Sequence, residues 1–359
     1  MCCKFQKTIA VWQNTVQWIL GVQIIFLGEK HMKEEEKEAF DNAYHRARRF
    51  VYKNARPLEL AKWQYHFENG SREAVLETLA CYPNGGFGYG LEPDYWNPHS
   101  SPSQTYEATE IIWEIGMERE DADHPVIQGI LEYLSSGKEF EDNSWAHTID
   151  TNNNYPHADW WHYPYASWWE DTPANRFATD YNPTAGLAGF ILYFEDPDTD
   201  FYDLAKEVAT EAINQFLMIK DCKEMYVVAC FCRLYDYIAE AGLEAEFPME
   251  AFEKRLKEVV FQTITQDVNL YITMWDVNIC RPSTFLRAKD SMYYEMNKNI
   301  AEFELEFIAK TQLGDGSWEV TWEWGKSYPA AWGVAKNWWK SKIAIQNLLY
   351  WSGMMDSEE

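Results

Sequence analysis

Titratable side chains gather in the stretch LEPDYWNPH at positions 91–99, and they are of the types that general acid–base catalysis uses. A single proline separates Glu92 from Asp94, so a turn at this point brings the two carboxylates together, and His99 follows in the same loop. A carboxylic acid among aromatic walls has its charged form disfavoured, which raises its pKa and allows it to donate a proton near neutral pH. We therefore predict Glu92, Asp94 and His99 as catalytic residues and Trp96 as a substrate contact. A solvated pair of capping carboxylates is the alternative.

A second cluster, DTNNNYPHADWWHYPYASWW, spans positions 150–169 and combines acids, histidines and aromatic rings. Aromatic faces stabilise cations, and they also stack on the apolar faces of sugars. A metal site would use His157, Asp159 and His162, but the spacing fixes no coordination geometry, so we predict no metal and no cofactor. A packing loop with hydrogen-bonded histidines is the plainer alternative. The residues predicted here are Asp150, His157 and Asp159 as catalytic groups and Trp160, Trp161, Tyr163 and Trp168 as substrate contacts.

Two later loops also carry tryptophans. The first begins at Trp275 and contains Arg281 and Arg287, cations that would bind a phosphate or carboxylate beside a cavity or pair with nearby acids. The second follows the glycine turn TQLGDGSW, which ends at Trp318, and continues to Trp322. We predict substrate contacts for Trp275, Trp318 and Trp322.

Helical patterns dominate the chain that must position these loops, and strand signals are weak. A representative case begins at Pro125, where Ile127, Ile130, Leu131 and Leu134 fall on one helical face. We predict helices over about 33–54, 58–69, 72–82, 105–115, 125–134, 201–219, 223–241, 249–265, 300–312 and 330–351, and a short strand over 269–274.

Four long loops separate these helices, and loops of such length in a compact domain are usually functional. No linker or block of like charges divides the chain, so we predict one all-α domain over residues 32–359. Residues 1–31 are predicted to be an N-terminal extension. Three interpretations of it stay open: a segment upstream of a start at Met32, a signal or anchor, and an extra helix packed on the domain. The four loops lie at about 84–103, 142–182, 275–290 and 314–329.

The composition restricts the partners. A net charge of −26 and a pI of about 4.7 argue against nucleic acids and anionic membrane surfaces. The apolar run at 9–27 is interrupted by glutamines and an asparagine, which makes a stable transmembrane span a poor interpretation. The seven cysteines form no CxxC pair and fit free thiols in a reducing compartment. We predict a cytoplasmic protein with a hydrophobic small-molecule substrate, and the oligomeric state stays open.

Two of the glycine turns resemble a known repeat. The Gln–x3–Gly–x–Trp pattern from Gln312 to Trp318 resembles the Gln–Trp repeat of squalene-hopene and other triterpene cyclases. The segment GGFG at 85–88, followed by His99 and the TYEA at 105–108, is similar to the repeat of protein prenyltransferase β subunits. The resemblance implies the α/α toroid of the terpenoid cyclase and prenyltransferase superfamily, in which helical hairpins form a ring and the long, aromatic-rich loops meet at one rim.

The function implied by this resemblance is the acid-initiated cyclisation of a hydrophobic isoprenoid, with Glu92 or Asp94 as the proton source. The sequence departs from the family in two respects: it contains no Asp-x-Asp-Asp motif, and it contains no recognisable zinc set. The nearest run, Asp196-Pro-Asp-Thr-Asp200, is better interpreted as a helix cap. Two alternatives stay open: a carbohydrate-active α/α-barrel lyase or hydrolase with paired carboxylates, and a toroid that binds without catalysis.

Overall fold

The computed structural model describes residues 34–82, 90–164, 170–273 and 279–355. The predicted extension 1–31 and the GGFG turn lie outside the described residues. The first helices in chain order are α2 (Glu34–Asn54), α3 (Pro57–Phe67), α4 (Arg72–Leu79), α5 (Pro102–Glu114), α6 (Pro125–Ser135), α7 (Pro173–Tyr181) and α8 (Thr184–Phe194). The later helices are α9 (Asp200–Met218), α10 (Met225–Glu240), α11 (Met249–Thr263), α12 (Val268–Thr273), α13 (Tyr294–Thr311) and α14 (Pro329–Met354).

Short elements complete the structure. β1 (Phe140–Glu141) and β2 (Ser144–Trp145) pair as an antiparallel hairpin. The 3-10 turns are η2 (Arg119–Asp121), η3 (Asp150–Asn154), η4 (Asp159–Trp161), η5 (Glu244–Glu246) and η6 (Pro282–Thr284). The all-α prediction is thus confirmed, since the described chain is mostly helical with almost no strand.

The predicted strand over 269–274 is wrong, because this region contains α12. The carboxylate of Asp267 accepts the backbone N–H of Asn269 at 2.9 Å, and its carbonyl accepts that of Leu270 at 3.0 Å. This local turn starts a helix, and it outweighs the strand preference of the residues that follow.

The start of α5 is also earlier than predicted. The helix begins at Pro102 rather than at Thr105, and its N-cap is Ser101. The Ser101 hydroxyl accepts the backbone N–H of Gln104 at 3.3 Å, and proline at the first helical position needs no hydrogen-bond partner there.

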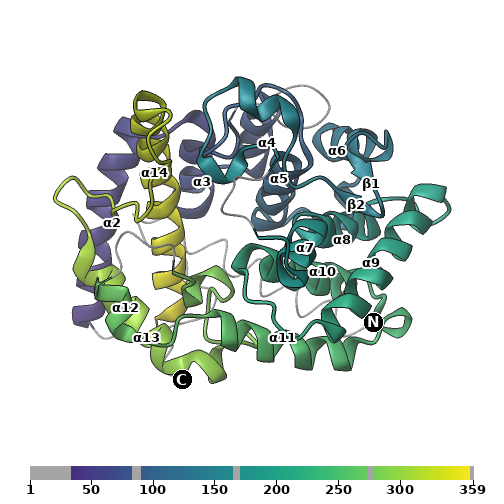
Figure 1. Ribbon diagram of the computed structural model, residues 1–359. Coiled ribbons are helices and arrows are strands. Elements are labelled where there is room, and N and C mark those ends of the chain that lie inside the picture. The colour runs from purple at the N-terminus through teal and green to yellow at the C-terminus, as the bar shows by residue number, and fades with distance from the viewer. Residues whose placement is uncertain (1–33, 83–89, 165–169, 274–278, 356–359) are drawn as a thin grey trace.

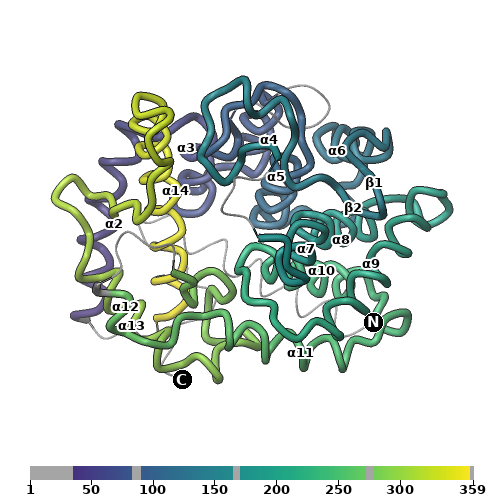
Figure 2. Tube along the Cα trace, in the orientation of Figure 1, coloured from purple at the N-terminus to yellow at the C-terminus, as the bar shows by residue number. Residues whose placement is uncertain are grey.

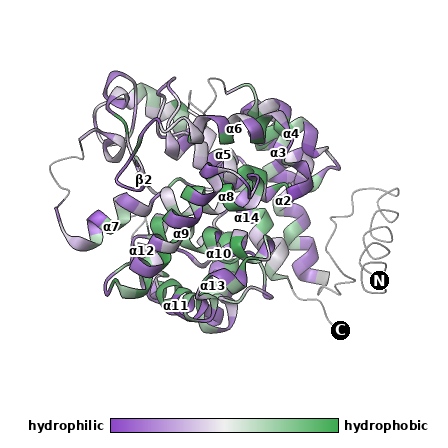
Figure 3. Cartoon of the chain, turned by 90° about the vertical axis from the view of Figure 1, so that its right-hand side faces the viewer, coloured by the Kyte–Doolittle hydropathy of each residue, from purple (hydrophilic) through white to green (hydrophobic). Residues whose placement is uncertain are grey.

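Helix α8 forms the centre of the core, although the sequence analysis missed it. Every residue from Thr184 to Phe194 is buried, so the helix has no polar face and no periodic pattern. Figure 3 shows α8 and α10 largely green near the middle of the molecule. Two glycines allow the close packing: a Cβ at Gly186 would lie 2.3 Å from the ring of Tyr106, and one at Gly189 would lie 3.1 Å from the Cα of Leu234.

Contacts between helices connect α5 through the later helices to α14 and α2. α5 packs on α8, α8 on α10, α10 on α11, α11 on α13, and α13 on α14 and α2. Helices α2, α3 and α14 contact one another, and Lys62 of α3 pairs with Glu114 of α5 at 3.1 Å. Figure 1 shows the first described helix, α2, beside the last, α14, and Figure 2 follows the trace between them.

The glycine turn before Trp318 has a strict steric requirement, which gives a first prediction. Gly316 has φ of +96°, and a Cβ there would lie 2.2 Å from the backbone oxygen of Arg46. We expect Gly316→Ala to lower the free energy of unfolding by about 1–3 kcal/mol, measured by urea denaturation. Gly314→Ala is the matched control, because a Cβ at Gly314 meets nothing within 4 Å. Equal stabilities of the two variants would contradict this account of the turn.

Candidate functional site

The carboxylate of Asp94 is the centre of the site, because three tryptophans donate their indole N–H groups to it. Its Oδ1 accepts from Trp324 and from Trp339, each at 2.6 Å, and its Oδ2 accepts from Trp322 at 3.2 Å. Asp94 lies between α4 and α5 and is 4% exposed, whereas its donors lie more than 200 residues later in the chain. These contacts join the 90–101 loop, the 312–328 loop and α14.

The 142–164 loop is held against the same place by backbone hydrogen bonds. Trp96 donates to the carbonyl of Pro156 at 3.0 Å, and Ala158 donates to the carbonyl of Asp94 at 2.9 Å. Between them Tyr95 and His157 form an antiparallel bridge. Three of the four predicted loops therefore meet at one place.

The fourth loop does not join them in its described part, 279–290, which corrects the prediction that all four loops share one rim. A Cβ at Gly353, near the end of α14, would lie 1.9 Å from the carbonyl oxygen of Arg287. Trp339, which reaches Asp94, lies 14 residues earlier on α14, a rise of about 21 Å. The loop before α13 is thus placed near the opposite end of α14.

Burial raises the pKa of Asp94 to about 6, although hydrogen bonds from the three indoles oppose the shift. The indole rings shield the carboxylate from water, and their N–H groups donate hydrogen bonds to it in place of water. Burial thus favours the protonated form of Asp94, and the three indole N–H groups favour the charged form.

Glu92, Lys342 and Glu107 form a second group beside Asp94. The Lys342 ammonium lies 3.4 Å from Glu92 and forms a closer ion pair with Glu107. Burial raises the pKa of Glu92 to about 8; Lys342 lowers it, and Glu107 and Asp94 raise it. Burial therefore favours the protonated form of Glu92, which makes it the candidate acid of the site.

Arg56 fixes the start of the 90–101 loop. It pairs with Glu59 and donates to the carbonyl oxygens of Gly90 and Leu91, the latter at 3.1 Å. Its guanidinium also lies 5.0 Å from the ring centroid of Trp338. Loop and helix α14 are thereby held together next to Glu92.

The predicted histidines and the remaining acids have different surroundings. His157 is buried, donates from Nδ1 to the carbonyl of Tyr155 at 2.6 Å, and lies 3.3 Å from a nitrogen of His162. His99, Asp150 and Asp159 are exposed. Their exposure argues against a place beside Glu92 and Asp94 in a closed cavity, so their catalytic roles stay predictions.

The predicted aromatic contacts also separate into groups. Trp96 and Trp322 lie beside Asp94, whereas Trp318 is a core side chain, 3% exposed, that donates to the carbonyl of Ile308. Such burial argues against substrate contact by Trp318. Trp160 and Trp161 are partly buried near the site, and Tyr163 is 45% exposed. Trp168 and Trp275 lie outside the described residues.

Four residues of the site were not predicted from the sequence: Lys342, Glu107, Trp324 and Trp339. A local signal exists for the last part of the chain, since Trp339 and Lys342 are three residues apart on α14 and therefore share a face. Nothing local connects either of them to residues 92–107, so the site as a whole is a product of the fold.

Other candidate features are structural in the described residues. The acids before α9 form a turn: Asp196 accepts the N–H of Asp198 at 3.0 Å, and Thr199 caps the helix. No set of three metal-ligating side chains occurs in the described part of the chain. Within the same residues, no helix is both long and apolar enough to cross a membrane.

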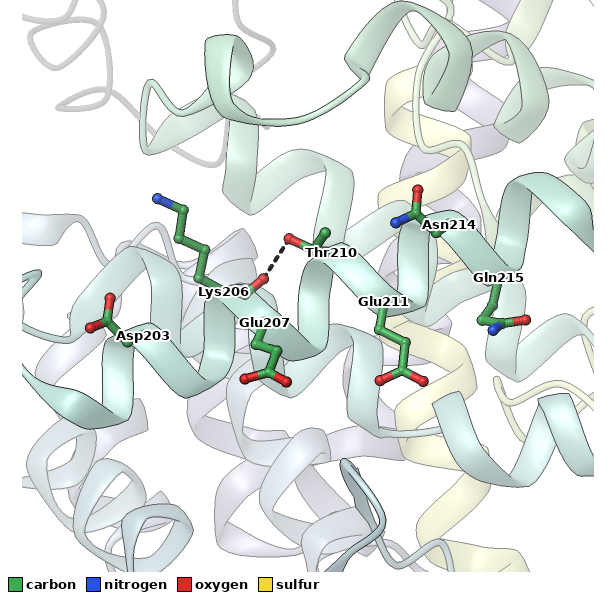
Figure 4. Close-up of a pocket in the computed structure, with 7 residues that line it drawn as sticks. All are labelled: Asp203, Lys206, Glu207, Thr210, Glu211, Asn214 and Gln215. Carbon is green, nitrogen blue, oxygen red and sulfur yellow. Dashed lines mark hydrogen bonds between the residues drawn. The ribbon is translucent and has the colours of Figure 1, made fainter.

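A shallow pocket on α9 is a solvated helix face. Figure 4 shows its side chains along successive turns, with Thr210 donating to the carbonyl of Lys206 at 2.7 Å. All of them come from one helix, so no second element converges on the pocket. They are Asp203, Lys206, Glu207, Thr210, Glu211, Asn214 and Gln215.

The raised pKa values predict a pH dependence of stability. An acid whose pKa is higher in the folded protein stabilises it below its ordinary pKa, and this stability is lost as the pH rises through the folded value. For Glu92 this stability is lost between its ordinary pKa of 4.5 and its folded pKa of about 8. For Asp94 it is lost between the ordinary pKa of 3.8 and the folded pKa of about 6. We expect Glu92→Gln to gain stability relative to the wild type between about pH 5 and about pH 8, by on the order of a few kcal/mol. Urea denaturation of both proteins at several pH values in this range measures the difference. If the free energies of unfolding of the two proteins change in parallel with pH, the pKa of Glu92 is not raised.

No family model, curated protein or solved structure matched this chain in the comparisons with known proteins. The function is therefore inferred from the geometry of the site. Its main features are a largely buried Glu92 with a raised pKa, an ammonium shared with Glu107, and Asp94 held by three indoles.

Proposed function

We propose that this chain is an enzyme of the α/α-toroid type that uses Glu92 as a general acid. The observation that carries the proposal is the position of Glu92, a carboxyl with a raised pKa that lies 3.4 Å from Lys342 where three loops meet α14. A toroid is supported by the helix contacts, which proceed from α5 through α8, α10, α11 and α13 to α14 and α2. The Gln–Trp-type turn from Gln312 to Trp318 supports the same superfamily.

Lys342 supports the role of Glu92 after proton transfer. The carboxylate that remains would lie 3.4 Å from an ammonium, so its new charge is paired at once. Glu107, on the other side of this ammonium, is a second carboxylate of the same site. Because both carboxylates contact the same ammonium, Lys342 lies between them, and only Glu92 is assigned a role as acid.

The ionic groups favour a glycoside over a hydrocarbon. Lys342 and Glu107 have side-chain exposures of 12% and 22%, so both charges lie beside Glu92 with little access to water. Hydrocarbon bound against them would desolvate charge without returning hydrogen bonds, which is unfavourable. Sugar hydroxyls would replace the lost water. We therefore propose hydrolysis of a glycosidic bond, for which no cofactor is needed. Glu92 gives its proton to the leaving oxygen as the C–O bond breaks, a water molecule adds its hydroxyl to the anomeric carbon, and the proton that the water releases restores the acid form of Glu92.

The isoprenoid reaction is the second candidate, and the indole rings favour it. The Lys342 ammonium lies 4.8 Å from the ring centroid of Trp339, which shows a ring face placed to stabilise a cation. A carbocation formed by protonation of an alkene would use such faces. The adjacent carboxylates would also capture that cation, which is why this candidate ranks second.

The experiment is a comparison of the two substrate classes with the purified full chain. One arm supplies neutral polysaccharides and oligosaccharides and measures new reducing ends; the other supplies squalene and prenyl diphosphates and measures cyclic products. Glu92→Gln is the inactive control for both arms. Reducing ends that depend on Glu92 support the first proposal, and cyclic products support the second. A protein that binds either class without product would be the non-catalytic toroid.

A further inference from the structure

Glu107 of α5 has no role in the proposed proton transfer, although it shares the Lys342 ammonium with Glu92. The ammonium lies 3.4 Å from Glu92 and closer to Glu107. The side chains of Lys342, Glu92 and Glu107 are 12%, 16% and 22% exposed, so water and salt screen their charges little. One cation is thus divided between two carboxyl groups, and the division favours Glu107.

Hydrogen bonds fix the backbone of Glu92 against the helix that carries Glu107. The backbone N–H of Glu92 donates to Oε1 of Gln104 at 3.2 Å, and Gln104 is a fully buried residue of α5, one turn before Glu107. The ammonium is restrained as well, since it lies 4.8 Å from the ring centroid of Trp339, one turn earlier on α14. Both carboxyl groups are therefore placed around one ammonium by the fold.

The other ionisable groups beside Glu92 have partners of their own. Arg56 pairs with Glu59, to which its Nε donates at 2.8 Å. Asp94 accepts from three indole N–H groups, and the hydroxyl of Tyr95 donates to another side chain. Lys342 is left as the cation that can balance either Glu92 or Glu107. The charged or titratable groups beside Glu92 are Lys342, Glu107, Asp94, Arg56 and Tyr95.

We propose that Glu107 is a positioning residue, which holds the Lys342 ammonium and thereby keeps the proton on Glu92. The inference rests on the proposed function, because Glu92 is the proposed acid. Without Glu107, the ammonium would pair with Glu92 alone and would favour its charged form. A carboxyl group that is already ionised has no proton to donate, so Glu107 sets the pH range in which Glu92 can act as an acid.

Measurements of stability test this role without a substrate. The free energy of unfolding that Glu92→Gln gains over its parent rises with pH until Glu92 is ionised in the folded parent, at about pH 8 in the wild type. In the Glu107→Gln background we expect this rise to end at least about one pH unit lower, because Lys342 then pairs with Glu92 without competition. Urea denaturation of the wild type, both single variants and the double variant from about pH 4 to about pH 9 measures the end of the rise.

Two further backgrounds make the test specific. Glu110→Gln is the matched control, because Glu110 lies one turn later on α5 and pairs with Arg233 instead of Lys342. It removes the same charge from the same helix and should leave the end of the rise where it is in the wild type. Lys342→Met removes the shared ammonium and should move the end of the rise to higher pH, because the charged form of Glu92 then has lost its cation.

The inference is overturned if the rise ends at the same or a higher pH in the Glu107→Gln background, or if Glu110→Gln shifts it equally. If Glu107→Gln does not fold, the Lys342→Met background decides: a higher end point supports the role of the ammonium, and an unchanged or lower one overturns it. Where turnover is measured, the alkaline limb of kcat/KM should move to lower pH in Glu107→Gln. Full turnover by Glu92→Gln together with the expected shift in stability would reject Glu92 as the acid and leave the control of its proton by Glu107 in place.

Discussion

A Glu92→Gln variant is expected to lose turnover by about 10²–10⁴-fold, the range in which general acid catalysis contributes. The amide keeps the size of the side chain and can still accept a hydrogen bond from Lys342, but it has no proton of suitable acidity to donate. The loss should appear in kcat with KM little changed, since the proton is transferred in the transition state. Steady-state kinetics on the substrate class found active is the measurement.

Two controls separate the loss of the proton donor from a loss of the folded structure. Glu73→Gln makes the same substitution at a side chain that is 61% exposed, and it should keep wild-type activity. Urea denaturation should show Glu92→Gln at least as stable as the wild type at about pH 8, because a strained acid has been removed. Full activity of a folded Glu92→Gln protein would reject Glu92 as the proton donor.

The acid pair was predictable because its chemistry is local. One residue separates Glu92 from Asp94, in a loop rich in aromatic and glycine residues. These features can be recognised from the sequence without knowledge of the fold. What could not be predicted is which acid is free to react. Three indoles from the end of the chain occupy the oxygens of Asp94, whereas Glu92 faces Lys342.

The helices were predictable to the extent that one face of each remains in water. α6 and α9 have apolar stripes and clear N-terminal signals, and their bounds agree with prediction within a residue or two. α8 is buried on every side, so its sequence has no alternation of apolar and polar residues to detect. The prediction for the fourth loop was wrong in its described part for another reason. The sequence indicates how long a loop is, but the packing of the helices decides at which end of the domain the loop lies.

Asp94→Ala is expected to destabilise the fold strongly, by about 3 kcal/mol or more. The substitution removes the acceptor of Trp322, Trp324 and Trp339, and each buried N–H left without a partner costs about 1–3 kcal/mol. Relief from burying a carboxylate offsets part of this loss. Because the three donors come from the 312–328 loop and α14, the 90–101 loop would also lose its main attachment to the end of the chain.

Asp94→Asn separates the hydrogen bonds from the charge. Its carbonyl oxygen can still accept from Trp324 and Trp339, while its amide N–H₂ would face the N–H of Trp322, whose bond is the longest of the three at 3.2 Å. We expect a loss of about 1–2 kcal/mol for this variant, between the wild type and Asp94→Ala. The free energies of unfolding of the three proteins are compared at the same pH, because the pKa of Asp94 is raised in the folded protein. If Asp94→Ala were no less stable than Asp94→Asn, the indole contacts would be incidental to the fold, and Asp94 would again be a candidate for direct chemistry.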